Sequence, residues 1–341
     1  MVHQAVIVRR GAPDVLQIRE TPDPSPGPDD VRIAVRAAGV NFADVMARLG
    51  LYPDAPPLPA VVGYEVAGVV DAVGASVTGL RPGDRVLALT RFGGYSSAVV
   101  VPAAQTLATP STLTDVEAAA IPVNYLTAFI ALYRLANVNA DETVLIYGAG
   151  GGVGIAATQL AKLRNAVVIG TASTTKLDAI RALGVDHVID HRREDVADRV
   201  RRLTSGRGAD VILDPIGGRH FAVSYKLLAP LGRLVVYGVS SLATGERRSV
   251  WRALRTLVAM PAFRPLSLMS HNRAVLGLNL GHLWGEGRQL RAALEAILHD
   301  VAAGRLRPVV ARTFPLERAA DAHRYLQSRA NIGKVVLTIE P

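Results

Sequence analysis

Apolar runs and helical patterns alternate along the chain from about residue 144 to residue 238. The run TVLIY precedes GVGIAATQLAKL, whose apolar residues recur at helical spacing, and the run AVVIG precedes STTKLDAIRALG. The series continues with DHVID, REDVADRVRRLT, ADVILD and GRLVVYG. Short apolar runs predict buried strands, and strands that alternate with helices predict a parallel sheet. We therefore predict an α/β domain with a doubly wound parallel sheet.

The first 120 or so residues have a different pattern. Short strand-like segments are separated by turns rich in glycine and proline, such as PDPSPGPDD and LRPGD. These segments are QAVIV, LQIRE, DVRIAVRAAGV, AGVVDAVG, DRVLAL and YSSAVVVP. Such spacing predicts an irregular β-rich domain, to which the final strand of the chain is expected to return. We assign residues 1–123 with 281–341 to the β-rich domain and residues 124–280 to the α/β domain.

The amino-acid composition limits the number of cores, the cross-links and the metal sites that the chain can form. The chain has 341 residues, 50% of them hydrophobic, which is enough to fill two cores. Cysteine is absent, which excludes disulfides and zinc sites built on thiolates. We see no signal peptide and no run of about 18 uninterrupted apolar residues, and so expect a cytoplasmic protein.

The chain is basic, with a formal net charge of +9. Its arginines are scattered, and neither a basic tail nor an RNA-binding motif accompanies them. Charge alone is weak evidence for nucleic-acid binding, so we expect no nucleic-acid partner. An anionic small ligand fits the charge equally well.

A glycine-rich turn follows the strand TVLIY. Residues 148–154, GAGGGVG, hold five glycines, and the helix that begins near Val153 directs its free N–H groups at the turn. A dinucleotide needs a tight bend, a bare backbone beside its diphosphate, and a small residue where helix meets strand. The contacts predicted for the diphosphate are Ala149, Gly151, Gly152, Val153 and Gly154.

The turn after the second strand predicts which dinucleotide binds. Enzymes that use NAD have an acidic residue about 20 residues after the glycine turn, where it accepts the ribose 2′-OH. Here AVVIG is followed by TASTTK, and no carboxylate occurs before Asp178. Ser173 and Lys176 instead offer a hydroxyl and a cation to a 2′-phosphate, although Ser173 or Thr174 is also expected to cap the next helix. We predict NADPH as the cofactor.

Motifs in both domains resemble those of one enzyme family. In chain order they are GVNFADVMARLGLYP, GYEVAGVVDAVG, FGGYSSAVVVP, AAAIPVNYLTAFIALY, GAGGGVG, LGVDHVID, GADVILDPIGG and NIGKVVL. Over essentially its whole length the chain resembles the zinc-independent medium-chain dehydrogenase/reductases, and among them the quinone oxidoreductases and their vesicle amine transport protein-like branch. The resemblance implies a GroES-like β domain joined to a Rossmann domain, with the cofactor in the cleft between them.

The resemblance also implies cofactor contacts by position. Lys176 and Ser173 match the family's contacts to the 2′-phosphate, and His191 stands where many relatives have a tyrosine near that phosphate. Pro215 departs from an asparagine that some relatives have. The further implied contacts are Asn124 and Thr127 beside the nicotinamide, Tyr237, Gly238 and Ser240 in the turn over the cofactor, Leu278 and Asn279 near its carboxamide, and Asn331.

The zinc-dependent members of this superfamily hold their metal with a cysteine, a His-Glu pair and a further Cys or Asp. In GYEVAG, Tyr64 replaces the histidine, and the first cysteine position falls near Asn41. These residue types cannot assemble a tetrahedral zinc site, so we expect no metal.

A conjugated acceptor needs less electrostatic help than a plain ketone, because its developing negative charge reaches an oxygen that a hydrogen bond can stabilise. Asn41, Tyr52 and Tyr64 are the candidate catalytic donors, and the alternative for Tyr64 is a packed aromatic side chain. We predict transfer of a hydride from NADPH to a quinone or an α,β-unsaturated carbonyl. The alternatives are an enoyl-thioester reductase of a biosynthetic pathway and a cofactor-bound lipid- or partner-binding protein with incidental activity.

A basic amphipathic stretch lies within residues 241–275 of the α/β domain. Its apolar residues at helical spacing and its interleaved arginines are Trp251, Leu254, Leu257 and Val258, with Arg247, Arg248, Arg252 and Arg255. We expect a lid over the substrate cleft or the subunit contact of a homodimer. Weak association with an anionic membrane surface is the second interpretation, and a solvated insertion is the third.

Overall fold

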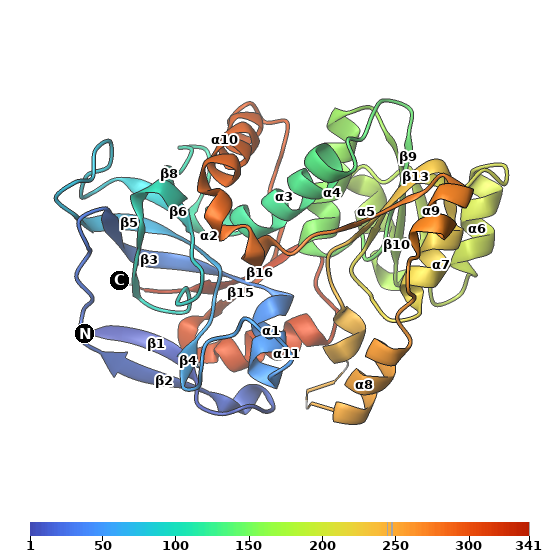
Figure 1. Ribbon diagram of the computed structural model, residues 1–341. Helices are drawn as coiled ribbons and strands as arrows, with labels where there is room; N and C mark the ends of the chain where they lie inside the picture. The colour runs from blue at the N-terminus through green and yellow to red at the C-terminus, as the bar shows by residue number, and fades with distance from the viewer. Residues whose placement is uncertain (244, 247, 341) are drawn as a thin grey trace. The chain divides into compact units, whose positions relative to one another are not determined.

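The computed structural model describes residues 1–243, 245–246 and 248–340, and of Val250 and Arg252 only the backbone. Arg247 and the side chain of Arg252 therefore lie outside the described residues. The chain forms two compact units (Figure 1). Unit 1 comprises Met1–Leu126, Gly245–Arg248 and Gly281–Pro341, and unit 2 comprises Thr127–Thr244 and Ser249–Leu280.

Unit 1 is rich in strands that are joined by glycine and proline turns. The strands are β1 (Val2–Ile7), β2 (Leu16–Thr21), β3 (Asp30–Val40), β4 (Ala60–Val61), β5 (Glu65–Val73), β6 (Arg85–Leu89), β7 (Ala98–Pro102), β8 (Thr106–Ala108), β15 (Val310–Pro315) and β16 (Lys334–Thr338). Its helices are α1 (Phe42–Leu49), α2 (Asp115–Ala118), α10 (Gly287–Ala302) and α11 (Ala319–Gln327), and α3 (Pro122–Phe129) begins in it.

Two sheets make up unit 1. The smaller has the order β2-β1-β4, and the larger has the order β15-β16-β3-β5-β6-β8, with β7 paired to β3. Along β3, Val31, Ile33 and Val35 alternate with half-buried residues and are at most 2% exposed, the period expected when one face of a strand is buried. The C-terminal β16 pairs antiparallel with β3, so the end of the chain returns to this domain.

Unit 2 is the α/β domain that the alternating pattern predicts. Its strands are β9 (Thr143–Ile146), β10 (Val167–Ala172), β11 (His187–Asp190), β12 (Ala209–Asp214), β13 (Leu228–Val236) and β14 (Ala274–Gly277). Its helices are α4 (Gly152–Leu163), α5 (Leu177–Ala182), α6 (Val196–Leu203), α7 (His220–Lys226), α8 (Val250–Val258) and α9 (Pro265–His271). A π-helical segment, Ile130–Leu135, continues α3.

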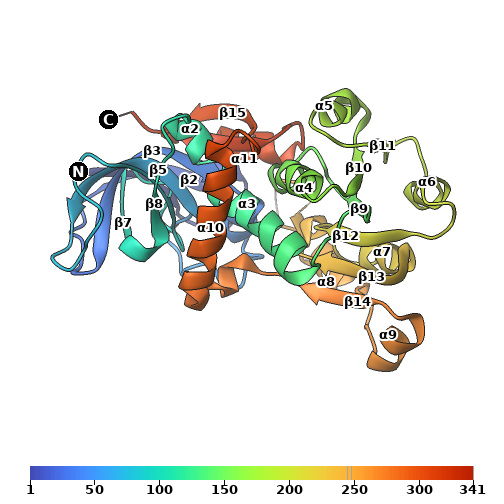
Figure 2. The same ribbon diagram turned by 90° about the horizontal axis from the view of Figure 1, so that it is seen from above.

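The strands of unit 2 form one parallel sheet with the order β11-β10-β9-β12-β13-β14. Figure 2 shows α4 on one face of this sheet and α6 and α7 on the other, which confirms the doubly wound α/β prediction. The strand order reverses between β9 and β12, so the connections that follow these strands run to opposite faces. In open α/β sheets, ligands bind at this point, beyond the carboxyl ends of the strands.

By length and composition, the helical stretch Asp115–Leu135 is apolar enough to cross a membrane. Most of it is buried within the protein, 72% of its apolar window, as the core helix of a globular protein would be. Length and composition are therefore weak evidence for a membrane span here.

A buried ion pair between Glu65 and Lys334 joins three elements of unit 1. The two side chains are 0% and 3% exposed. Lys334 Nζ also donates to Asn41 Oδ1 at 2.6 Å, and Asn41 Nδ2 donates to Glu65 Oε1 at 3.0 Å. The other carboxylate oxygen accepts from the backbone N–H of Val123 at 2.7 Å. The pair thus links the start of β5, the start of β16 and the turn between β3 and α1.

We expect Lys334→Met to destabilise the protein by about 3 to 5 kcal/mol, because the variant leaves the Glu65 carboxylate buried without its counter-charge. Urea unfolding followed by circular dichroism measures the change. Lys162→Met is the matched control: the Lys162–Asp186 pair has side chains 39% and 35% exposed, and its loss should cost less than about 1 kcal/mol. Equal losses for the two variants would contradict the importance of burial.

Candidate cofactor and catalytic site

The glycine turn connects β9 to α4 and is closed by its own backbone. Gly148 has a φ of 67°, in the left-handed region that favours glycine. A Cβ at Gly154 would lie 2.7 Å from Ala149 Cα and would also collide with the carbonyl oxygen of Gly148. Any side chain at Gly154 would therefore push α4 away from the end of β9, which is the role of the last glycine in a dinucleotide turn.

The N-terminus of α4 is free to receive an anion. The helix runs for 12 residues from Gly152, and Gly151 at its N-cap has no side chain to cap it. The unpaired N–H groups of the first turn and the positive end of the helix dipole favour a negatively charged group at this position. The predicted contacts Ala149, Gly152 and Val153 lie in the same turn, so these residues fit the diphosphate of a dinucleotide.

The turn after β10 carries Ser173 and Lys176. A Cβ at Gly150 would lie 3.3 Å from Lys176 Cδ, so the lysine side chain runs beside the glycine turn. The predicted helix cap was wrong: Ser173 holds the N-cap of a 3-10 turn, Thr174–Lys176, without a side-chain bond. The Thr174 hydroxyl instead donates to the carboxylate of Asp190 at the end of β11.

The other predicted cofactor residues of unit 2 follow the carboxyl ends of its strands. His191 follows β11 and is exposed, and Leu278 and Asn279 follow β14. After β13, the backbone N–H of Ser240 donates to the carbonyl of Pro215 at 2.9 Å, and a Cβ at Gly238 would lie 3.1 Å from that carbonyl. The sheet thus brings these turns to one edge.

The remaining predicted cofactor residues are spread over several elements. Tyr237 directly follows β13, and burial, followed by the charge of Asp214, raises the pKa of its hydroxyl. Asn124 and Thr127 lie one turn apart on α3 and are 6% and 7% exposed. Asn331 precedes β16, and its Nδ2 donates to the carbonyl of Gly333 at 2.8 Å.

Asn41 is the first of the three predicted catalytic donors, and both the oxygen and the nitrogen of its side-chain amide are hydrogen-bonded. Its oxygen accepts from Lys334, and its nitrogen donates to Glu65. The side chain is 7% exposed. In this arrangement the amide holds the ion pair in place, and its nitrogen also lies 3.5 Å from the carbonyl oxygen of Gly39, so an acceptor would have to compete with both partners for its two protons.

Tyr64 lies directly before β5 and is 6% exposed. Its hydroxyl is buried and makes no hydrogen bond of good geometry within the described part of the chain. The ring packs edge-on against that of Tyr52, with centroids 6.2 Å apart, and lies 5.1 Å from that of Phe92. Burial above all, and then the charge of Asp44 and the neighbouring Tyr52, raise the pKa of the Tyr64 hydroxyl.

This raised pKa decides what Tyr64 can do. A hydroxyl that keeps its proton donates a hydrogen bond to a developing anion without giving the proton up.

Tyr52 is half-buried and lies beside Tyr64. Around them, no three His, Asp, Glu or Cys side chains of the described residues gather as a metal site requires.

A buried carboxylate, Asp44, lies beside this aromatic pair. It accepts hydrogen bonds from the backbone N–H groups of Asn41 at 2.8 Å and Gly63 at 3.0 Å, and from the Tyr95 hydroxyl at 3.0 Å. Burial raises the pKa of Asp44 to about 7, although these hydrogen bonds oppose the shift. Asp44 therefore fixes the start of α1 against the turn that carries Tyr64.

The polar chain continues from Tyr95 to His323 and Arg48. Tyr95 Oη lies 3.1 Å from His323 Nε2, and Arg48 Nε donates to His323 Nδ1 at 3.2 Å. Because Arg48 always donates, the histidine must carry its proton on Nε2 and donate it to Tyr95. Burial lowers the pKa of His323, which is consistent with a neutral ring.

A serine, a histidine and an aspartate also meet in unit 2. Asp214 Oδ2 accepts from Ser224 Oγ at 2.6 Å and lies 2.7 Å from His220 Nδ1. A nucleophilic triad needs the serine on the histidine nitrogen that the aspartate does not bind. Here both side chains contact the same carboxylate oxygen, so the group fixes the loop after β12 and is not a nucleophile.

Four buried charged residues were not predicted from the sequence: Glu65, Lys334, Asp190 and Asp214. Each is a charged residue at the end of an apolar strand, 0 to 4% exposed. A charge inside an apolar run was the available signal, because such a residue is buried only when it has a partner. The identity of each partner depends on the fold.

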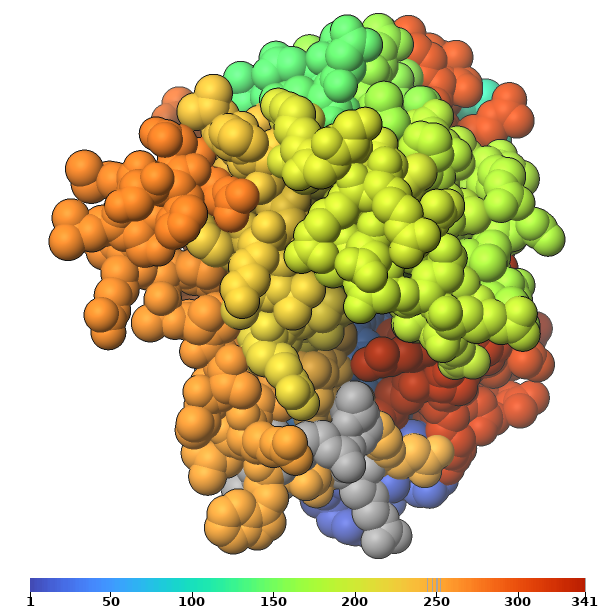
Figure 3. Space-filling view, turned by 90° about the vertical axis from the view of Figure 1, so that its right-hand side faces the viewer, coloured from blue at the N-terminus to red at the C-terminus, as the bar shows by residue number. Residues whose placement is uncertain are grey.

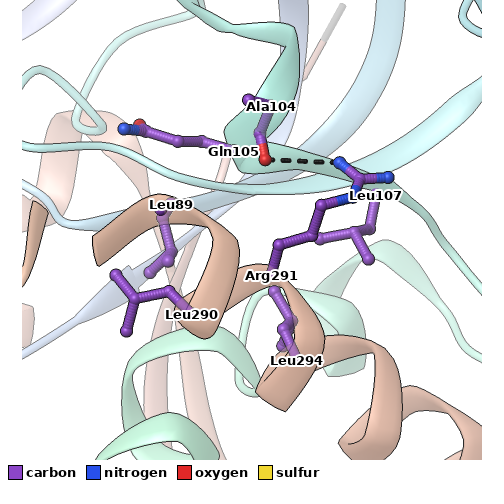
Figure 4. A pocket seen from close by; sticks show the side chains of 8 residues that line it. Leu89, Ala104, Gln105, Leu107, Leu290, Arg291 and Leu294 are labelled. Carbon is purple, nitrogen blue, oxygen red and sulfur yellow. Dashed lines mark hydrogen bonds between the residues drawn. The ribbon is translucent and has the colours of Figure 1, made fainter. Parts of the chain in front are cut away.

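A small pocket elsewhere in unit 1 is lined by few polar groups (Figure 4). Its lining is mostly apolar, with leucines from β6, β8 and α10. Arg291 also lines it, but its Nη1 donates to the carbonyls of Ala104 and Thr106, each at 3.2 Å, and its Nε to Glu295 at 2.9 Å. None of the predicted site residues lines this pocket.

The helix predicted between residues 241 and 275 forms as α8 and exposes an apolar stripe. Trp251, Leu254 and Val258 are 82%, 50% and 78% exposed, with Leu257 at 53%. Figure 3 shows α8 and α9, in orange, at the margin of this face of unit 2. What covers the stripe, a second subunit, a membrane surface or solvent, stays a prediction.

Comparison with known proteins gives consistent matches over both units. Residues 27–111 match the alcohol dehydrogenase GroES-like domain, and residues 183–337 match the zinc-binding dehydrogenase family. The chain is 42% identical to the synaptic vesicle membrane protein VAT-1 homolog of Rattus norvegicus, over 96% of this chain and 81% of that protein.

Two solved structures are similar over nearly their full lengths. Quinone oxidoreductase of Escherichia coli, complexed with NADPH, has 30% identity and a TM-score of 0.87, covering 98% of this chain and 99% of that chain. CurK enoyl reductase has 28% identity and a TM-score of 0.86, covering 99% of each chain.

The pKa of Asp44 predicts a pH-dependent stability. Its value of about 7 in the folded protein exceeds the ordinary 3.8, so the neutral form stabilises the fold below pH 3.8 and this stabilisation is lost as the pH rises to about 7. Relative to Asp44→Asn, the wild type should lose up to about 1.4 kcal/mol of unfolding free energy per pH unit in this window. Urea unfolding of both proteins between pH 5 and pH 8 measures the difference, and a constant difference would contradict the raised pKa.

Proposed function

The chain belongs to the medium-chain dehydrogenase/reductase family, in the branch of VAT-1 homologues, and on this premise we propose that it reduces quinones or α,β-unsaturated carbonyls with NADPH. Membership makes the chain an oxidoreductase with a nicotinamide cofactor. The observation that carries the choice of acceptor is the buried Tyr64 hydroxyl, which makes no hydrogen bond of good geometry among the described residues and has Tyr52 as its polar neighbour. By the sequence resemblance, Tyr64 occupies the position at which zinc-dependent members of the superfamily have a histidine.

The cofactor would be held by the residues at the carboxyl edge of unit 2. The glycine turn and the N-terminus of α4 receive the diphosphate, and Lys176 and Ser173 receive the 2′-phosphate. In the turn after β10, no described acidic residue is placed to accept a ribose 2′-OH before Asp178, which pairs with Arg181 at 2.7 Å. When bound, the reduced nicotinamide supplies the hydride.

The acceptor would be activated by hydrogen bonds from unit 1. As negative charge develops on the acceptor oxygen, the Tyr64 hydroxyl donates to it, with Tyr52 beside it. Because its raised pKa keeps the proton on Tyr64, the proton that neutralises the product comes from water. A quinone or enone suits this arrangement, because conjugation carries the developing negative charge to a carbonyl oxygen, which these donors can stabilise.

The similarity to CurK enoyl reductase favours a second candidate within the same chemistry, an enoyl-thioester. This acceptor also places negative charge on a carbonyl oxygen, so the same donors would serve it. Steady NADPH consumption measured with quinones, short enones and acyl-thioesters tests the proposal. Turnover with none of the three would overturn the assigned function.

We expect Lys176→Ala to weaken NADPH binding about tenfold or more and to leave NADH binding nearly unchanged, because a charge-assisted contact to a phosphate contributes roughly 1.5 to 3 kcal/mol. Titration calorimetry with both cofactors measures this. Lys226→Ala, on α7, is the control and should change neither affinity. Equal losses for NADPH and NADH would contradict the 2′-phosphate assignment.

We expect Tyr64→Phe to lower turnover roughly a hundredfold while the affinity for NADPH stays the same, as found when an essential oxyanion donor is removed. Stability should not fall, because a buried hydroxyl without a hydrogen bond of good geometry costs the wild type about 1 to 3 kcal/mol. Tyr225→Phe is the matched control, since its hydroxyl is also buried without a partner among the described residues. If Tyr64→Phe and Tyr52→Phe both keep turnover within about twofold, positioning alone must carry the reaction.

A further inference from the structure

Two neighbouring turns of unit 2 are bound together by one carboxylate. Strands β10 and β11 run parallel and end at the same edge, with Ala172 paired to Asp190. Asp190 is 4% exposed. It accepts a hydrogen bond from the Thr174 hydroxyl in the turn after β10 and another from the backbone N–H of Arg192, at 3.0 Å, in the turn after β11.

Asp190 is ionised in this position. The hydrogen bond from Thr174 is the main cause of its lowered pKa. Arg193 lies nearby, with its Nε 4.0 Å from Asp190 Oδ2. Each carboxylate oxygen therefore already accepts a protein donor, and the 4% exposure of the residue leaves little of it accessible to the 2′-OH of an NAD ribose.

Positive charge gathers around the two turns. Lys176 ends the first turn, and Arg192 is exposed on the second. Among the described residues, no ion pair or side-chain hydrogen bond holds the Arg192 guanidinium. The nearby acidic side chains of Asp178 and Glu194 are paired with Arg181 and Arg199 at 2.7 Å and 3.0 Å.

We propose that Asp190 holds these two turns as a single site for the 2′-phosphate of NADPH, in which Arg192 is a second cation beside Lys176. The proposal rests on the proposed cofactor and adds two roles to it. Asp190, acting through Thr174, is a positioning residue, and Arg192 contacts the phosphate itself. Ser173 and Lys176 then meet the phosphate from one turn and Arg192 meets it from the other.

Direct binding tests the role of Arg192. Titration calorimetry with NADPH, NADH and 2′,5′-ADP, which carries the 2′-phosphate without the nicotinamide, requires no turnover. Arg192→Gln should weaken NADPH and 2′,5′-ADP about tenfold and leave NADH unchanged, as expected for one lost charge-assisted contact. Arg181→Gln, an exposed arginine of α5, is the matched control and should change none of the three affinities.

Thr174→Val tests the positioning by Asp190 without changing any charge. It should weaken NADPH and 2′,5′-ADP roughly threefold to tenfold, with NADH unchanged, because the first turn loses the bond that orients it. Thr174→Ser should restore wild-type affinity, and Thr175→Val, in the same turn, should behave as wild type. Thermal unfolding checks that every variant is folded.

The results separate this proposal from the cofactor assignment. If the wild type prefers NADPH and binds 2′,5′-ADP while Arg192→Gln and Thr174→Val leave the preference intact, the two-turn site is wrong and the cofactor assignment stands. If the wild type binds NADPH no better than NADH and does not bind 2′,5′-ADP, both are wrong.

Discussion

The buried Glu65–Lys334 pair is the interaction on which unit 1 depends. Removing two charges from water costs several kcal/mol per ion, and only close contact with further hydrogen bonds can offset that cost. Asn41 and the backbone of Val123 supply those bonds. A Cβ at Gly39 would collide with the Glu65 carboxylate, so the glycine of β3 is part of the same arrangement. The pair fixes β5, β16 and the start of α1 in one position and thereby places the turn that carries Tyr64.

In unit 2, the topology of the parallel sheet brings the candidate cofactor residues together. In a parallel sheet every strand delivers its next residue to the same edge, so turns distant in sequence meet there. Buried carboxylates then set the shape of those turns: Asp190 holds the ones after β10 and β11, and Asp214 holds the loop after β12. The turns that would discriminate between cofactors are thus held by a sheet that is stabilised by the burial of its apolar strands.

The sequence predicted the elements better than the contacts. Period-two burial in β3 and the apolar runs of unit 2 specify strands locally, and α4 begins within one residue of the predicted start at Val153. The segment STTKLDAIRALG was expected to be one helix but forms a 3-10 turn and a short α5. The bond from the Thr174 hydroxyl in this turn to Asp190 was also missed, because Asp190 lies on another strand. The Lys334–Glu65 pair was missed for the same reason.

An orphaned hydroxyl does not by itself identify a catalytic group. Those of Tyr64, Tyr147 and Tyr225 are all buried without a partner among the described residues, each at a cost of about 1 to 3 kcal/mol. Tyr64 differs in its surroundings, because the ring of Tyr52 packs edge-on against it and Asp44, whose charge raises its pKa, also anchors the turn before it. Under the proposed function, a donor that is held in place and keeps its proton can stabilise an anion that exists only during the reaction.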